Sequence, residues 1–185
     1  MKMRRTWLLP ILLLTIVMLF SACADKKASV TQTVDTLFSL LRRGQFTEAD
    51  AYFLPAQGDD AVTIPNTAFT RALFAGIEAK VWRAEGDEAE LCITQKSMHR
   101  VYMVAMEKTA GISMESDAGK QLWANAVAEA MNETTETAVF VVTVPLVREN
   151  GTLRFRLTDE LLNALYGGEL DALNTFEKIG EKANG

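Results

Sequence analysis

The feature that most constrains this chain is an uncharged run near its start, which ends abruptly at a cysteine. After the basic segment MKMRR, seventeen residues from Thr6 to Ala22 carry no charge, and Cys23 is followed by the polar stretch ADKKAS. A membrane-spanning helix needs about 20 apolar residues, so this run is slightly short for a span. A basic segment before a short apolar run is typical of a signal peptide. The folded domain is therefore expected to lie after residue 22.

The end of this run resembles a bacterial lipoprotein signal, in which a large aliphatic residue, two small residues and a cysteine direct cleavage before the cysteine. Phe20, Ser21, Ala22 and Cys23 fill these positions, with Phe20 in place of the usual leucine. The resemblance implies cleavage between Ala22 and Cys23 and a diacylglycerol joined to the Cys23 sulfur by a thioether. The alternative is an ordinary signal peptide or a simple N-terminal anchor, with Cys23 incidental.

The lipoprotein interpretation divides the chain into three parts. Residues 1–22 are the signal peptide, residues 23–30 are the lipidated cysteine and a tether, and residues 31–185 are a single domain. The interpretation predicts a lipid-anchored protein at the cell membrane, with its domain on the extracytoplasmic side. Two or more acyl chains give stable anchoring, whereas one chain alone binds only marginally.

The charge and the cysteines limit the possible partners. The chain has a formal net charge of −5, and removal of Lys2, Arg4 and Arg5 with the signal takes it to −8. Phosphate contacts need clustered Lys and Arg, so an acidic domain argues against a nucleic-acid partner and against attraction to anionic lipid. After lipidation of Cys23, only Cys92 remains, so no intramolecular disulfide can form. Cys92 is expected to be a small buried hydrophobe in a strand.

The first half of the domain is predicted from the spacing of its apolar residues. A first helix that ends near Gly44 is predicted by an apolar stripe at helical spacing, formed by Val34, Leu37, Phe38 and Leu41. A short second helix follows, and residues 66–75 predict a third. From residue 76 the period changes to two, so residues 76–96 predict a hairpin that turns at 85–87.

The second half of the domain is predicted to begin again with helices. Two consecutive helices are predicted over 97–110 and from an N-cap at Asp117. A second hairpin follows, with the type I′ turn signal Asn150-Gly151 between its strands. A last helix begins at Asp159 and ends at the two glycines 167 and 168.

The first strand of the second hairpin, TAVFVVTVPLV, has two special features. It is apolar on both faces, so it is expected to be covered on both sides. It also contains Pro145, which cannot donate to a strand ladder and therefore predicts an edge or a bulge.

Two stretches, VDTLFSLLRRGQFTEADAYF and GTLRFRLTDELLNALYGG, resemble the opening and the close of small bacterial lipoproteins with a nuclear transport factor 2-like, or cystatin-like, domain. The resemblance implies an α+β fold with N-terminal helices packed on a curved antiparallel sheet, here of about four strands. It also implies a concave pocket between sheet and helices. The superfamily includes enzymes such as ketosteroid isomerase and many members without catalysis, so the fold alone does not decide the function.

The candidate catalytic residues do not form a complete set. His99 is the only histidine, and its neighbours Lys96 and Arg100 favour a helix-surface position. Superfamily isomerases need a carboxylate base beside an oxyanion hole, and no Asp or Glu falls on an identifiable inward strand position. The acidic tracts lack the spacing of a calcium loop. No metal or cofactor is therefore expected.

The remaining candidate is a pocket for an apolar ligand, because Met and aromatic side chains adapt to irregular shapes. Ordinary core packing is the alternative for the same five residues, which are Trp82, Met98, Tyr102, Met106 and Trp123. The expected function is a non-enzymatic lipoprotein that binds a small apolar ligand or docks on an envelope protein. The alternative is a small lyase or isomerase that acts on a hydrophobic compound.

Overall fold

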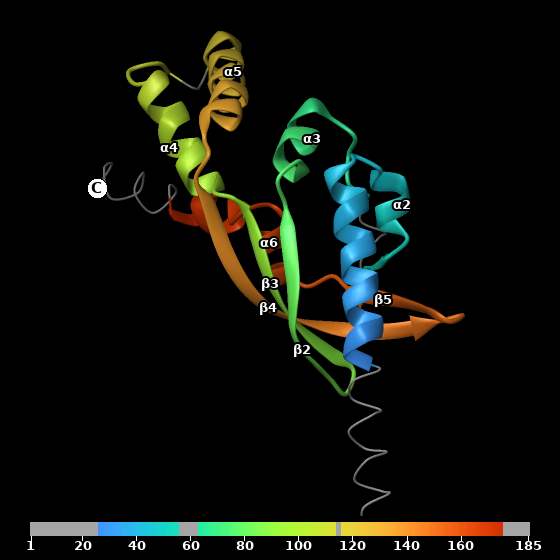
Figure 1. The fold of residues 1–185 in the computed structure, drawn as a ribbon. Coiled ribbons are helices and arrows are strands. Elements are labelled where there is room, and N and C mark those ends of the chain that lie inside the picture. The colour runs from blue at the N-terminus through green and yellow to red at the C-terminus, as the bar shows by residue number, and fades with distance from the viewer. Residues whose placement is uncertain (1–25, 56–62, 114–115, 176–185) are drawn as a thin grey trace, which may run out of the picture.

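The structure is a computed structural model, and it describes residues 26–55, 63–113 and 116–175 (Figure 1). The predicted signal peptide and Cys23 lie outside these residues. The chain is already helical at residues 26–30, which the sequence analysis assigned to the tether, and Val30 is buried. Among the described helices, none has the length and apolar character needed to cross a bilayer.

Three helices open the domain. The chain is helical over residues 26–42, and α2 (Phe46–Asp50) and α3 (Ala68–Phe74) follow. Gly44 has a φ of 69°, a left-handed conformation that suits the end of a helix, as predicted. A capping box formed by Thr67 and Thr70 begins α3. The three predicted helices are thus confirmed.

The sheet has five strands in the order β1-β5-β4-β3-β2. Their bounds are Phe53–Leu54 for β1, Glu78–Glu85 for β2, Glu88–Lys96 for β3, Thr137–Glu149 for β4 and Thr152–Arg156 for β5. Both predicted hairpins are confirmed, but the expected count of about four strands and the purely antiparallel sheet are wrong. The additional strand, β1, pairs parallel to β5. Its two residues are too few to show a period of two.

The long strand β4 changes partners at Pro145. Residues 137–145 pair with β3, and residues 146–149 pair with β5. Figure 1 shows the strong curve that β4 makes between these two parts. Asn150 and Gly151, with φ values of 49° and 82°, form the predicted turn. Pro145 therefore lies where one ladder ends and the other begins, which agrees with its missing donor.

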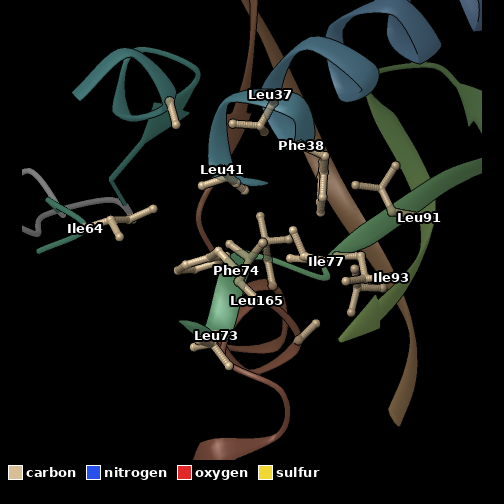
Figure 2. Packing of buried hydrophobic residues seen from close by; sticks show 14 of the residues in the cluster. Leu37, Phe38, Leu41, Ile64, Leu73, Phe74, Ile77, Leu91, Ile93 and Leu165 are labelled. Carbon is tan, nitrogen blue, oxygen red and sulfur yellow. The ribbon is translucent and has the colours of Figure 1, made fainter. Parts of the chain in front are cut away.

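The core lies between the inner face of the sheet and the helices. Figure 2 shows side chains from the first helix, from α3 and from β3 pointing toward one another, with Leu165 of α6 (Asp159–Leu165) beside them. Lys27 Nζ donates to the Trp82 carbonyl at 3.0 Å, and Arg42 Nη1 donates to the Ile77 carbonyl at 3.0 Å. These two hydrogen bonds join the first helix to β2 at Trp82 and to Ile77, the residue before β2.

The outer face of the sheet differs from the prediction. Val139 and Val141 of β4 are 63% and 48% exposed, so the expectation that this strand is covered on both sides is wrong. Their partners across the ladder are Thr94 and Cys92, and Cys92 is half-buried rather than buried. Alternate residues such as Val142 and Val144 point into the core instead.

Two helices, α4 (Met98–Lys108) and α5 (Asp117–Glu133), are inserted between β3 and β4. In Figure 1 they lie side by side and project beyond the end of the sheet. The N-cap of α5 is Ser116, one residue before the predicted Asp117, because the Ser116 hydroxyl accepts from Gly119 N–H at 3.1 Å. After α6 the chain is again helical over 169–175.

Candidate functional site

The α4–α5 pair forms the candidate site. The two helices pack against each other, and α5 carries Ala126 and Ala130 among its buried residues. Lys108 ties the helices together, because its ammonium group donates to Glu129 and Glu133 at 2.8 Å each. Hydrogen bonds to these two carboxylates raise the pKa of Lys108. The helices are therefore held together along one side.

An apolar cleft of about 490 Å³ opens between the two helices. It is lined by Met106, Thr109, Ala110, Lys120 and Trp123. The Thr109 hydroxyl donates to the Ala105 carbonyl at 2.9 Å, so that polar group is already bonded within α4. Sites for small molecules typically occupy roughly 300–1,000 Å³ and have mostly apolar walls. The cleft has the size and the chemistry of such a site.

The structure brings together three of the five predicted pocket residues. Met106 and Trp123 line the cleft, and the ring of Tyr102 lies 6.1 Å from that of Trp123 at an interplanar angle of 30°. Met98 is fully buried at the start of α4, so it belongs to the core. Trp82 is 54% exposed on β2 and does not line this cleft.

No sequence pattern pointed to Thr109, Ala110 or Lys120 as residues of the site. These residues lie near the ends of α4 and α5 that the intervening loop joins. The two predicted consecutive helices could have indicated these residues. A short connection makes neighbouring helices antiparallel, so residues at their joined ends lie close together. The prediction of the pocket used apolar side chains alone, so it named only aromatic and methionine residues.

Tyr102 connects the cleft to the end of the described chain. Its hydroxyl donates to Glu169 Oε1 at 2.5 Å, and Glu169 begins the helical segment 169–175. Burial, followed by the hydrogen bond to Glu169, raises the pKa of the Tyr102 phenol well above its usual range. Tyr102 is thus a hydrogen-bond donor that supports Trp123, and it does not line the cleft itself.

Tyr102→Phe should lower the stability of the domain by about 1 kcal/mol at neutral pH, because a hydrogen bond to a carboxylate is lost. The folded-state pKa of the phenol is raised, so its contribution is fully present below the unfolded value of about 10 and is lost as the pH rises toward the folded value. The difference in urea midpoint between wild type and variant should therefore shrink above about pH 10. A difference that does not change with pH would contradict this role of Tyr102.

The other candidate residues lie apart from the cleft. His99 is on the exposed side of α4, Glu78 is exposed on β2, Asp87 is in the β2–β3 turn, and Glu90 is partly buried on β3. Among the residues that the structure describes, no group of three or more His, Cys, Asp or Glu side chains is placed to hold a metal ion.

Compared with protein-family models, curated proteins and solved structures, the chain has no match. Its function therefore has to be inferred from the geometry of the cleft and from the chemistry of the sequence.

Proposed function

We propose that the protein is a membrane-anchored extracytoplasmic lipoprotein that binds a small apolar ligand in the α4–α5 cleft without transforming it. The observation that carries this proposal is the cleft of about 490 Å³, in which Met106 and Trp123 form the apolar wall. The ring of Trp123 lies 6.1 Å from the ring of Tyr102, and the Tyr102 hydroxyl donates to Glu169. A wall held in this way is pre-organised, which lowers the entropic cost of binding.

The anchoring part of the proposal depends on the sequence. Phe20, Ser21, Ala22 and Cys23 form the expected cleavage and lipidation signal. The acidic composition supports a covalent lipid as the membrane link, because a net negative domain is not attracted to anionic headgroups.

We further propose that the domain has a nuclear transport factor 2-like fold, and the arrangement of its elements supports this. The first helix and α3 pack on the inner face of a curved sheet, and the second hairpin leads into α6, which is the arrangement expected of a nuclear transport factor 2-like domain. In that case the α4–α5 pair is an insertion between two strands, and the cleft is a feature of the insertion rather than of the cone.

Docking on a protein partner is a second candidate function, and exposed apolar residues of the inserted helical region favour it. Met106 of α4, Ile112 after α4 and Leu122 of α5 are each exposed. Exposed apolar side chains that gather in one place mark binding surfaces. The lyase or isomerase alternative needs a carboxylate beside a tyrosine at the base of the cavity. Glu169 does accept from Tyr102, but neither residue lines the cleft, and among the described residues that line it there is no carboxylate. This alternative therefore has less support.

Filling the cleft should abolish ligand binding. Ala110 is exposed and lines the cleft, so Ala110→Trp occupies its volume without disturbing the core. Full-length protein in lipid nanodiscs would be photolabelled with dodecanol that carries a diazirine, and labelled peptides would be quantified. Labelling of α4 and α5 should saturate in the wild type and weaken by about tenfold or more in the variant.

The matched control is Ala51→Trp, which adds the same side chain to an exposed position after α2. It should label as the wild type does. Equal labelling of the Ala110→Trp and wild-type proteins, or no saturable labelling of α4 and α5, would contradict ligand binding in the cleft. In the second case, crosslinking of the rim to a protein in the native membrane would support docking instead.

A further inference from the structure

Among the described residues that line the cleft, one side chain is charged. Met106, Thr109, Ala110 and Trp123 are uncharged, and Lys120 carries a positive charge. A lysine beside an apolar surface lays its methylene groups along that surface and keeps its ammonium group in water. Lys120 therefore extends the apolar wall with its stem and places a cation at the rim.

The ammonium group of Lys120 can donate hydrogen bonds to a ligand. Its acidic neighbour is Asp117, three residues earlier on α5, with 3.7 Å between Nζ and Oδ1, and both side chains are exposed. Exposed ion pairs contribute little, and an ammonium group has three donors. Lys108 differs, because it holds two carboxylates at 2.8 Å. Of these two lysines, Lys120 is the one positioned to bind an additional anion.

We propose that the ligand of the cleft is an amphiphilic anion: an apolar chain or ring with a single acidic head group, such as a carboxylate or a phosphate, that pairs with Lys120. This inference rests on the proposed function of the cleft. The apolar part lies against Met106 and Trp123, and the head group remains at the rim beside the ammonium group. Complementarity of this kind gives specificity more than affinity.

The acidic character of the domain does not oppose this pairing strongly. Charges beyond about 8 Å are largely screened at physiological ionic strength, whereas a head group at the rim contacts Lys120 directly. Asp117, the acidic partner of Lys120, is exposed and offers a cationic ligand a competing partner. The sign of the head group is therefore the quantity to test.

The test uses three diazirine ligands with the same dodecyl chain, which end in a carboxylate, an alcohol or a trimethylammonium group. Each is titrated against full-length wild type, Lys120→Met and Lys80→Met in nanodiscs. Lys80 is exposed on β2 and lines none of the cleft, so its variant removes the same charge elsewhere. Because each ligand is compared across variants, its own partition into lipid cancels.

We expect Lys120→Met to weaken saturable labelling by the carboxylate about three- to fivefold, the scale of an exposed ion pair, and to leave labelling by the alcohol unchanged. Lys80→Met should change neither. The carboxylate effect should fade at high salt.

The inference is overturned if Lys120→Met weakens labelling by the carboxylate and by the alcohol equally, or if Lys120→Met weakens labelling by the trimethylammonium ligand as much as labelling by the carboxylate. Both outcomes leave the proposed function intact. The proposed function itself fails if the alcohol does not label the wild-type cleft saturably, so the two failures are distinguishable.

Discussion

Gly167→Ala is expected to destabilise the domain by about 3 kcal/mol or more, a large share of the roughly 5–15 kcal/mol that stabilises a typical domain. A Cβ atom at this position would lie 2.1 Å from the carbonyl oxygen of Lys96 and 3.3 Å from Cγ of Gln95. The Lys96 oxygen belongs to the backbone, so the clash cannot be relieved by a change of rotamer. Gly167 also has a φ of 65°, which costs an alanine about 1–2 kcal/mol.

The backbone shift would also break contacts that join the last helices to the start of α4. Met98 N–H donates to the Gly167 carbonyl at 2.9 Å, and the buried Gln95 side chain donates to the Leu165 carbonyl at 2.9 Å. A buried polar group left without its partner costs about 1–3 kcal/mol. The variant should thus loosen the base of the α4–α5 pair as well as the turn itself.

Gly151→Ala provides the matched control. Gly151 has a φ of 82°, but a Cβ there would have no heavy atom within 4 Å. Gly151→Ala should therefore lower the free energy of unfolding only by the cost of the left-handed backbone conformation, about 1 kcal/mol. Urea unfolding of both variants measures the difference, and equal midpoints would show that the close approach to Lys96 carries no energy.

Gly167 also illustrates what the sequence could and could not predict. The two glycines after DELLNALY predicted the end of the last helix, because glycine suits a left-handed cap. The short distance between Gly167 and Lys96 depends on how α6 lies across β3, and no local sequence pattern encodes that distance. The position of the turn was predictable, whereas the reason that only glycine fits was not.

The same division applies to the sheet and the site. Apolar alternation predicted both hairpins, since a period of two is visible within each strand. It failed at Val139 and Val141, because an apolar residue shows only that burial is favourable, not that another element is available to cover it. The side-chain types of Met106 and Trp123 predicted that they could line a pocket. Lys120 lies beside them only because α4 packs on α5.

Cys23→Ser is expected to abolish both lipid attachment and cleavage before residue 23. In the proposed lipidation the thiolate of Cys23 is the nucleophile that forms the thioether, and a serine hydroxyl cannot replace it. Cells grown with an alkyne fatty acid would show labelled wild-type protein and no label on the variant, and intact mass would show the signal segment retained. Cys92→Ser is the matched control, because it removes the other cysteine in a half-buried strand position, and it should be lipidated and cleaved normally.

The consequence for the cleft is geometric. At most about 3.6 Å of chain per residue separates Cys23 from residue 26, so a lipid on Cys23 holds Lys26 within roughly 11 Å of the bilayer surface. In Figure 1 the first described residues of this helix lie at the opposite end of the fold from the α4–α5 pair. A lipidated Cys23 therefore predicts that the cleft is held away from the bilayer. If Cys23→Ser is instead cleaved at the same bond and still enters the detergent phase on partitioning, the anchor lies elsewhere and this orientation does not follow.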